Sequence, residues 1–524
     1  MQVSSLSRSE HPKPGRKHWL DSDNICRKTA KVKENPLKLA RLQHNGHVPD
    51  HRVPKPSRGS IELPRTARPD RELASASDSS PGTNRHRRGG GELDSLATVL
   101  RLIRAGAAGT RHEIETVSGL GRAVVADRIA TLNAFGLIDE GDLAPSQGGR
   151  APRQVRFRGE AGYILVGAVG NVSLGVGLAD LSGRLVMEHH ERSGIAAGTA
   201  RTLDRLEELL DWVLAERAAA AGNLWGIGLA MPGPVERGRP RGETVVHLAP
   251  NWTGHPVSER LRTRFNAPVW VDNDAHLMAL AELRAGRGVG LQDLLFLKVG
   301  TGISVGLCTD GQIHRGARGY AGDIGHTVVA DDGPLCRCGN TGCLEAVAGG
   351  VALAREAIVG TDGRSAYLTE LAGAGRPLTA ADVGMGAFHG DSFCMEVVSR
   401  CGRLLGGTLA TLVNAYNPSL VVVGGGVAQA GEILVSAMRE TLYRRSRSLA
   451  TQEVTIVRSE LGRTAGLLGA ALAVGDELFA WDRLRAWIAD GSPVQRPFAA
   501  PSHPTRKPES TLLIGGPSIH RARP

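Results

Sequence analysis

Three cysteines and one histidine lie close together in the chain with the spacing of a metal site. Cys336, Cys338 and Cys343 fall within eight positions, and His326 lies ten residues before the first of them. Zn²⁺ takes four such sulfur and imidazole ligands tetrahedrally, and a complete Cys3His set leaves no position open for water. We therefore predict a structural zinc ion that braces a loop. The alternative is three unrelated core cysteines, which needs an unusual local density.

The other cysteines are predicted to be ordinary thiols. Cys26, Cys308, Cys394 and Cys401 show no ligand spacing, and seven cysteines in all do not indicate a disulfide framework. A reducing compartment is therefore expected. The sequence has no apolar run long enough to span a membrane, and its first 30 residues lack the apolar core of a secretory signal. We expect a cytoplasmic protein without membrane contact.

The positive charge is confined to the start of the chain. Residues 1–91 contain 19 Lys+Arg and 9 Asp+Glu, which accounts for the whole net charge of +10. This region is rich in Pro, Ser, Arg and His without sustained periodicity, so we predict a disordered basic extension. Such an arm could also add non-specific affinity for nucleic acid. The Pro-rich residues 483–524 are predicted to be a disordered tail.

Residues 92–158 show the pattern of a small DNA-binding domain. Thr110 and Glu113 have capping-box spacing, and the glycine turn at 118–121 separates two short helices. Two strands with a basic, glycine-rich tip follow, which completes a winged helix-turn-helix. The predicted apolar faces are Leu96, Leu100 and Ile103; Ile114 and Val117; Val125, Ile129 and Leu132; and, in the second strand, Val155 and Phe157.

Four arginines in this region are candidates for contacting DNA. They are Arg111 at the start of the first helix of the motif, Arg122 and Arg128 on the second, and Arg150 in the wing, which could enter a minor groove. The alternative for each is a solvated surface side chain. For the whole region it is a helical domain that binds a protein partner.

Residues 160–482 alternate short apolar runs with glycine-rich turns and amphipathic helices. The runs end in glycine or polar residues, as buried strands do where they lead into ligand-binding loops. They are "YILVGAVG", "WGIGLAMPG", "PVWVDND", "LLFLKVG" and "SLVVVGGG". The pattern predicts an α/β body, of a size that favours two lobes.

Several stretches of this body resemble the ROK family, which contains repressors and sugar kinases. The resemblance rests on "GYAGDIGHTVV" followed by "CRCGNTGCLE", and on "AMPGPV", "VDNDAHLMALAE", "KVGTGISVGLCTDGQIHRGARG", "NPSLVVVGGGVAQAG" and "GRTAGLLGAALA", in the family's order. It covers residues 160–480, and the preceding winged helix is similar to the repressor branch.

The resemblance implies an actin-like fold of two lobes, each a mixed sheet with helices, and a sugar cleft between them. By motif position, Asn273, Asp274 and Glu345 would hydrogen-bond sugar hydroxyls. His326 could do so with one nitrogen while it binds zinc with the other. Asp323 stands where the family usually has Glu, so sugar choice could differ. A phosphorylated sugar would need a basic residue near the cleft, and the sequence pattern places none there.

The kinases of the family resemble one another at a phosphate loop, Asp-x-Gly-Gly-Thr, in which the acid serves magnesium. Here Ala168 stands at the Asp position, and Gly170, Asn171 and Val172 replace Gly-Gly-Thr. Asp274 occupies the position of the kinases' general base, but a base without a positioned phosphoryl group cannot transfer it. The glycines at 300–302 and 424–426 match other nucleotide loops, although they also suit tight turns.

These features predict a sugar-responsive transcriptional regulator rather than an enzyme. We expect it to act as a repressor of carbohydrate metabolism genes. Its partners would be operator DNA, a sugar or sugar phosphate, and further copies of the chain in a homodimer or homotetramer. One alternative is an ATP-dependent, glucokinase-like sugar kinase with an appended DNA-binding domain. Another is a binding module that meets a protein partner.

Overall fold

The computed structural model describes most of the chain from residue 85 onward. The described ranges are 85–143, 152–217, 220, 222–236, 245–246, 257–480 and 483–484, and they belong to one compact unit, Pro81–Pro524. The predicted basic extension and C-terminal tail lie almost wholly outside these ranges. So do Cys26 and Arg150.

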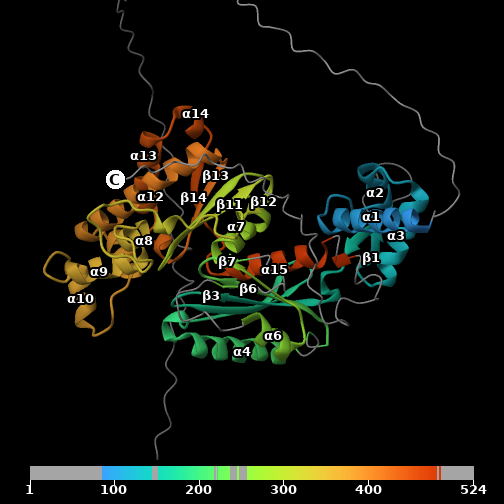
Figure 1. Ribbon diagram of the computed structural model, residues 1–524, viewed down its shortest axis with the longest axis horizontal. Helices are drawn as coiled ribbons and strands as arrows, with labels where there is room; N and C mark the ends of the chain where they lie inside the picture. Colours follow the sequence, from blue (N-terminus) through green and yellow to red (C-terminus); the bar gives the residue numbers. More distant parts are fainter. Residues whose placement is uncertain are drawn as a thin grey trace, which may run out of the picture. The chain divides into compact units, whose positions relative to one another are not determined.

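The N-terminal domain consists of three helices followed by a two-stranded antiparallel sheet (Figure 1). These are α1 (Arg85–Arg104), α2 (Arg111–Ser118), α3 (Arg122–Ala134), β1 (Ile138–Leu143) and β2 (Arg153–Phe157). Their types and order are as predicted. Thr110 forms the capping box with Glu113, and Gly119 ends α2 in the left-handed conformation, with φ of 68°.

Two details of this domain differ from the sequence prediction. Helix α1 begins at Arg85, before the predicted boundary at residue 92. The boundary was drawn where sustained periodicity begins, and the helix continues through three consecutive glycines, 89–91, each of which costs a helix about 1 kcal/mol relative to alanine. Val117, predicted to face the core, is 56% exposed, whereas Ile114 is fully buried. The eight-residue helix α2 turns only Ile114 inward, and Val117 lies in its last turn.

The first lobe is built on a five-stranded mixed sheet in the order β5-β4-β3-β6-β9. The strands are β3 (Tyr163–Val169), β4 (Leu174–Asp180), β5 (Leu185–Glu191), β6 (Leu224–Met231) and β9 (Val269–Asn273). Helices α4 (Thr199–Glu216) and α6 (Val257–Phe265) cover one face, and α15 (Thr464–Leu478) covers the other (Figure 1). Along β3, Ile164 and Val166 face α15 while Leu165 faces α4, as the period of two in a strand requires.

The second lobe repeats this topology. Its sheet has the order β12-β11-β10-β13-β14, with the same mixture of antiparallel and parallel neighbours. The strands are β10 (Leu294–Val299), β11 (Ile303–Thr309), β12 (Gln312–His314), β13 (Leu420–Gly424) and β14 (Thr455–Arg458). Helix α7 (Asp274–Ala285) packs on the face that includes Leu294 and Phe296. The opposite face, which includes Leu295 and Leu297, packs against the large helical core.

The remaining elements are short or cover the second lobe. The helices are α8 (Leu344–Ala348), α9 (Gly350–Gly360), α10 (Ala366–Gly373), α11 (Ala380–Phe388), α12 (Ser392–Tyr416), α13 (Glu432–Arg445) and α14 (Ser448–Thr451). The 3-10 turns are η2 (Gly159–Ala161), η3 (Ile195–Ala197), η5 (Ile324–His326) and η6 (Gly426–Ala430), and β7 (Val235–Glu236) pairs with β8 (Val245–Val246).

Each sheet is covered on one face by the helix that follows the last strand of the other sheet. Helix α7 follows β9 of the first sheet and packs on β10 and β11, whereas α15 follows β14 of the second sheet and packs on β3 and β6. The two helices also pack against each other. Their approach requires glycine, because a Cβ at Gly469 of α15 would collide with the carbonyl oxygen of Leu277 in α7.

The N-terminal domain shares one hydrophobic core with the first lobe. Leu100 and Ile103 of α1 belong to the same buried cluster as Ile164 of β3 and Val474 of α15. No helix in the described ranges is both long enough and apolar enough to cross a membrane.

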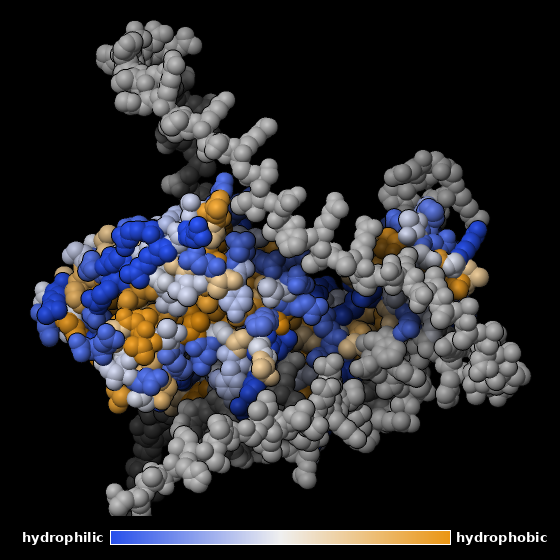
Figure 2. All heavy atoms as spheres, turned by 45° about the horizontal axis from the view of Figure 1, so that its top comes forward, coloured by the Kyte–Doolittle hydropathy of each residue, from blue (hydrophilic) through white to orange (hydrophobic). Residues whose placement is uncertain are grey.

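Exposed apolar side chains gather on the second lobe. Phe388 of α11 is 76% exposed, and Ile358 and Val351 of the adjacent helix α9 are also largely open to solvent. Figure 2 shows hydrophobic residues on the surface at the left, the side on which Figure 1 places α9 and α10. Contiguous exposed apolar surface of this kind marks interaction sites in many soluble proteins.

Candidate functional site

The four predicted metal ligands come together. The ligand atoms of His326, Cys336, Cys338 and Cys343 all lie within 4.8 Å of one another. Sγ of Cys338 is 3.6 Å from Sγ of Cys343, and Sγ of Cys336 is 3.4 Å from Nδ1 of His326. Tetrahedral zinc, with bonds of about 2.0–2.3 Å, separates its ligand atoms by roughly 3.4–3.8 Å. The donor set and its spacing therefore suit a metal ion.

The loop that carries these ligands has little hydrophobic support of its own. Its buried apolar cluster consists only of Cys336, Cys343 and Ala346, while Leu335 is 74% exposed. Two isolated bridges, Val328–Cys343 and Leu335–Thr341, fold it into a compact turn. A bound ion would hold together a segment that its own apolar side chains do not.

The electrostatics differ between the buried and the exposed cysteine of the cluster. Burial raises the pKa of the Cys343 thiol to about 12, and the neighbouring Cys338 and Cys336 sulfurs act in the same direction. The exposed Cys338 has a lowered pKa, chiefly because of a backbone hydrogen bond from Asn340. A thiolate at the buried position therefore needs a cation beside it, which a divalent metal provides.

Asn273 and Asp274 stand at the junction of β9 and α7. The Asn273 side chain caps α7 by accepting hydrogen bonds from the amides of Ala275 and His276, and its Nδ2 donates to the carbonyl of Gly233 at 2.8 Å. The two residues are only 8% and 7% exposed. They are thus fixed in place, as a site that selects among hydroxyl patterns requires.

The buried carboxylate of Asp272 orients the start of α7. It accepts hydrogen bonds from the amide of Asn273 at 2.9 Å and from Nε of Arg315 at 2.9 Å. Nε2 of His276 donates to the carbonyl of Ala321 at 2.9 Å, which ties α7 to the segment just before Asp323. Sequence analysis did not single out Asp272 or Arg315, since neither lies in a position with an obvious chemical role.

The Asp274 carboxylate is not free. Its Oδ2 accepts a hydrogen bond from Nζ of Lys298, which lies on β10, and the two side chains are only 10% and 19% exposed. The sequence pattern could not place a basic residue near the sugar-binding candidates, and the structure places Lys298 beside one of them. One signal pointed to this position: no other lysine occurs between Lys55 and Lys507.

Glu345 is held in a similar way. At the start of α8, its Oε2 accepts the amide of Ile303 at 3.1 Å, and its Oε1 lies 2.8 Å from Nε of Arg337. A Cβ built on Gly325, next to His326, would lie 3.5 Å from Cβ of Glu345, so η5 and α8 are in contact. His326 directs Nδ1 to the metal cluster, which leaves Nε2 for a ligand. Asp323 is exposed.

The structure thus places four of the five predicted sugar-binding residues around the strand pair β10–β11, and the fifth, Asn273, precedes Asp274 at the end of β9. Asp274 lies beside β10, Glu345 is bonded to the first residue of β11, and Asp323 and His326 belong to the segment at η5, where the carbonyl of Gly322 accepts the amide of Val305 at 2.8 Å.

The segment that matches the kinases' first phosphate loop is a tight hairpin. Ala168 is on β3 and pairs with Gly175 of β4 and Ala230 of β6. A Cβ at Gly466, in the first turn of α15, would lie 3.3 Å from Cβ of Ala168, so α15 approaches β3 closely at this point. The turn closes by a hydrogen bond from the Gly170 amide to the Ser173 carbonyl at 2.7 Å, and Val172 is 58% exposed.

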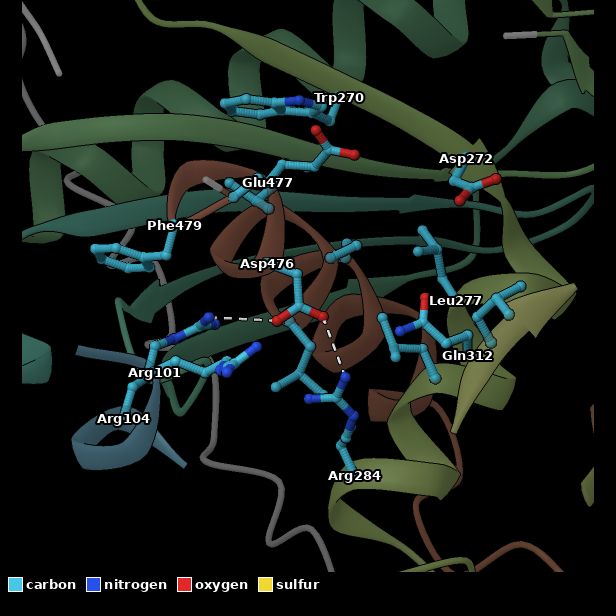
Figure 3. A pocket seen from close by; sticks show the side chains of 18 of the residues that line it. Arg101, Arg104, Trp270, Asp272, Leu277, Arg284, Gln312, Asp476, Glu477 and Phe479 are labelled. Carbon is cyan, nitrogen blue, oxygen red and sulfur yellow. Dashed lines mark hydrogen bonds and ion pairs between the residues drawn. The ribbon is translucent and has the colours of Figure 1, made fainter. Parts of the chain in front are cut away.

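A cavity of about 1050 Å³ lies between helix α1 and the packed helices α7 and α15 (Figure 3). At its edge, Asp476 of α15 accepts from Arg104 of α1 at 3.3 Å and from Arg284 of α7 at 3.5 Å. Burial lowers the pKa of Arg104, whose guanidinium also stacks 4.9 Å from the ring centre of Phe479. These contacts connect the N-terminal domain to the helix that begins with Asp274.

The predicted DNA-contacting arginines differ in their surroundings. Arg122, at the start of α3, is exposed, and Arg111 pairs with Glu140 of β1 while remaining 47% exposed. Arg128 is only 12% exposed, and its Nε donates to Oγ of Ser95 in α1 at 2.9 Å. Its location fits a packing role between α1 and α3 rather than the open surface expected from the sequence.

The chain belongs to the ROK family, whose pattern matches residues 168–477, more than half of its length. It is 28% identical over 375 residues to a xylose repressor of Caldicellulosiruptor bescii, covering 70% of this chain and 92% of that protein. It is also 32% identical over 308 residues to a glucokinase of Halalkalibacterium halodurans, covering 58% of this chain and 93% of the kinase.

Solved structures agree with this assignment. The structure of a ROK family transcriptional regulator, described as a homologue of the Escherichia coli MLC protein, aligns with a TM-score of 0.63 at 23% identity, over 76% of this chain and 99% of that one. That likeness establishes the fold. A ROK family glucokinase from Streptomyces griseus, solved with glucose and AMPPNP, aligns with a TM-score of 0.51 at 28% identity, over 60% and 99%.

Proposed function

We propose that this protein is a sugar-responsive, DNA-binding transcriptional regulator, acting as a repressor of carbohydrate metabolism genes. The observation that carries the proposal is the direct packing of the N-terminal domain against the elements that hold the candidate sugar-binding residues. Helix α1 of the N-terminal domain shares a buried core with the first lobe and pairs through Asp476 with α7, the helix that begins with the sugar-binding candidate Asp274.

The N-terminal domain supplies the elements for DNA binding. Helix α2, the turn at Gly119 and α3 have the order of a helix-turn-helix, and β1 and β2 follow where a wing is expected. Arg122 and Arg111 are the exposed candidates for contacting DNA. The xylose repressor match is longer than the glucokinase match, 375 residues against 308, and the difference is about the length of this domain.

The sugar-binding role rests on Asn273, Asp274 and Glu345, together with His326 and Asp323. Fixed amide and carboxylate groups pair with several hydroxyls of a sugar at once, and unpaired groups penalise the wrong sugar. The metal ion, which we propose is Zn²⁺ in a structural role, would be held by His326 and the three cysteines. It would fix the His326 ring so that Nε2 faces the ligand.

Two features argue against a kinase. Ala168 has no oxygen to hold magnesium, and Gly170, Asn171 and Val172 stand where the kinases have Gly-Gly-Thr. Asp274, at the position of the kinases' base, has Oδ2 engaged by Lys298, which competes with any substrate hydroxyl for that oxygen. In this proposal Asp274 is a ligand-binding residue and not a general base.

The test is a gel-shift titration on the DNA upstream of the protein's own gene, at fixed salt, with a panel of free and phosphorylated sugars. The protein should carry one equivalent of zinc. We expect a specific shift whose midpoint changes with one sugar. Equal operator affinity with and without every sugar in the panel would contradict a sugar-responsive regulator.

The alternative, a sugar kinase with an appended DNA-binding domain, is favoured by the glucokinase relatives alone. A coupled ADP assay with each sugar tests it, using the wild type and Asp274→Asn. We expect sugar-dependent ADP formation at the background rate in both. Sugar phosphorylation that is measurable in the wild type and disappears in Asp274→Asn would show that the protein is a kinase, against our proposal.

A further inference from the structure

Arg337 lies in the loop that carries the metal-ligand candidates, between Cys336 and Cys338. The backbone on both sides of it is fixed. The Cys336 amide donates to the carbonyl of Asn340 at 2.8 Å, and the Gly339 amide donates to the carbonyl of Cys336 at 3.0 Å. Because arginine does not serve as a zinc ligand, the role of this residue must lie in what its side chain contacts.

The guanidinium of Arg337 contacts the Glu345 carboxylate with two of its nitrogens. Nε lies 2.8 Å from Oε1, and Nη2 donates a hydrogen bond to Oε2 at 3.3 Å. A two-point contact between these planar groups fixes the orientation of the carboxylate as well as its position. Lysine could not replace arginine in this respect, because its ammonium group is a single point charge. The arginine therefore sets the orientation of Glu345.

The protein contacts of Glu345 take up most of its capacity to accept hydrogen bonds. An ionised carboxylate has about four lone-pair sites, two on each oxygen. Oε2 accepts from Arg337 and from the amide of Ile303 at 3.1 Å, whereas Oε1 contacts only Nε of Arg337 among the described residues. One site therefore remains, and it is on Oε1. Glu345 can accept one hydrogen bond from a ligand.

Stability does not explain this ion pair. The Arg337 side chain is 60% exposed, although that of Glu345 is only 11% exposed, and a pair with one solvated member contributes little to the stability of a fold. A Cβ on Gly302 would lie 2.6 Å from Oε2 of Glu345, so the backbone of that turn closes one side of the carboxylate. The effect of the pair is therefore expected in how Glu345 meets a ligand.

We infer that Arg337 is a specificity-determining residue of the proposed sugar site, which fixes Glu345 so that Oε1 accepts a single hydroxyl of a monosaccharide. A sugar that lacks this hydroxyl, or an epimer that points it elsewhere, leaves Oε1 unpaired and binds more weakly. Arg337 acts through Glu345, so it is a positioning residue. The inference rests on the proposed function, because it concerns a ligand-binding candidate of the same site.

The test is isothermal titration calorimetry on the full, zinc-loaded chain without DNA. Glucose, mannose, galactose and xylose are titrated first, and then the monodeoxy derivatives of the sugar that binds most tightly, each of which lacks one hydroxyl. Loss of the hydroxyl bound by Glu345 should weaken binding by roughly 10- to 100-fold, as for a hydrogen bond to a charged group. In Arg337→Met this one penalty should fall at least about fivefold, while the penalties for the other hydroxyls stay the same.

Three further variants identify the route of the effect. Glu345→Gln should reduce the penalty for the same hydroxyl, and Arg337→Lys should reduce it less than Arg337→Met does, since an ammonium group keeps the charge but not the two-point contact. Arg403→Met breaks an exposed pair with Glu396 on α12 and should leave every penalty unchanged. Each variant should keep its zinc, because none of these residues belongs to the metal cluster.

Several results would overturn the inference. They are no binding of any of the four sugars to the wild type, unchanged penalties in Arg337→Met, penalties that all fall together, as a general disturbance of the site would produce, and loss of zinc from Arg337→Met. A penalty for a different hydroxyl in Glu345→Gln would do the same. Should Arg337→Met fail to fold, Arg337→Lys and Glu345→Gln decide the question, because both must change the penalty for one and the same hydroxyl.

These outcomes are separable from those of the gel shift. A change confined to one hydroxyl in Arg337→Met, with no specific DNA shift, would leave the role of Arg337 standing and remove the regulator. A DNA shift that responds to a sugar, with unchanged penalties in Arg337→Met, would leave the regulator and remove the role of Arg337.

Discussion

Arg104 of α1 and Asp476 of α15 form an ion pair, with Nη1 3.3 Å from Oδ1, although they lie 372 positions apart in the chain. Asp476 pairs in addition with Arg284, in the last turn of α7. One carboxylate thus joins the N-terminal domain, helix α15, which covers the first sheet, and helix α7, which begins with the proposed sugar ligand Asp274.

Asp476→Ala is expected to weaken the coupling between effector binding and operator binding. Because the pair is partly exposed, its contribution to stability should stay within about 1 kcal/mol, and operator affinity without effector should hardly change. The change in operator affinity caused by the effector should fall by roughly fivefold or more. Operator titrations with and without effector measure both quantities. Arg403→Ala breaks a more exposed pair with Glu396 on α12 and serves as the control; an equal effect of the effector on operator affinity in the two variants would refute this role.

Removal of the metal should destabilise the second lobe. At free zinc about 100-fold above its Kd, a site stabilises the folded chain by about 2.7 kcal/mol, which corresponds to roughly 5–10 °C in melting temperature. Chelation, or Cys338→Ser, should lower the melting temperature by that amount and abolish the single equivalent of zinc seen by elemental analysis. Cys308→Ala changes a cysteine outside the cluster and should keep the zinc. A melting temperature insensitive to chelation would argue against a structural ion.

Arg122 and Arg128 should respond differently to substitution. Arg122→Ala removes an exposed cation and should lower the slope of log K against log salt for operator binding by about 1. Arg128→Ala removes a hydrogen bond to Ser95 within the domain, and should lower stability by about 1 kcal/mol while leaving the salt slope unchanged. Filter binding across a salt series, with urea unfolding, separates the two effects. A lower salt slope in Arg128→Ala, with no change in Arg122→Ala, would show that Arg128 contacts DNA.

Alkaline pH should weaken the contribution of Cys401 to stability. Burial raises the pKa of this thiol to about 12, above the value of about 8.5 expected in the unfolded chain. A folded-state pKa that is raised in this way contributes stability that is fully present below about pH 8.5 and is lost as pH rises toward 12. The stability difference between the wild type and Cys401→Ala should therefore shrink above pH 8.5, by up to about 1.4 kcal/mol per pH unit.

Urea unfolding from pH 7.5 to 10.5 measures this difference. Val398→Ala, a buried substitution on the same helix without a titrating group, should show a constant difference over the same range. A constant difference for Cys401→Ala would mean that the thiol ionises as readily in the folded chain as in the unfolded one.

Self-association should depend on the exposed apolar surface of α9 and α11. Phe388→Glu places a charge at its most exposed side chain and should shift the chain toward the monomer in light scattering at micromolar concentration. Leu449→Glu changes an equally exposed apolar residue on α14 and should leave the mass unaltered. A mass unaffected by Phe388→Glu would place any interface elsewhere.

Five strands of the two sheets were predictable because their apolar runs end in glycine or polar residues. Strands β3, β6, β9, β10 and β13 correspond to the five predicted runs. Strand β5 was missed because it is only half-buried, and its "LVMEHHE" sequence carries polar residues on a partly exposed surface. The metal cluster was predictable because its four ligands are close in sequence, and spacing alone restricts their geometry.

The charge network of the site was beyond sequence reasoning. Lys298 lies within an apolar strand run, and its partner Asp274 is brought to it only by the packing of α7 on β10. Arg104 and Asp476 belong to different domains at opposite ends of the chain. Composition alone marks Lys298, since it is the one lysine between Lys55 and Lys507 in a segment rich in arginine.

The exchange of helices between the two sheets has a consequence for synthesis of the chain on the ribosome. The first sheet is complete once Asn273 has been added, but α15, which covers one of its apolar faces, begins at Thr464, 191 positions later. At about 5–20 residues per second, translation needs roughly 10–40 s to supply it. Throughout that interval the nascent first lobe presents an uncovered hydrophobic face, so its yield in the cell should depend on chaperones that hold the half-made chain until the last helix arrives.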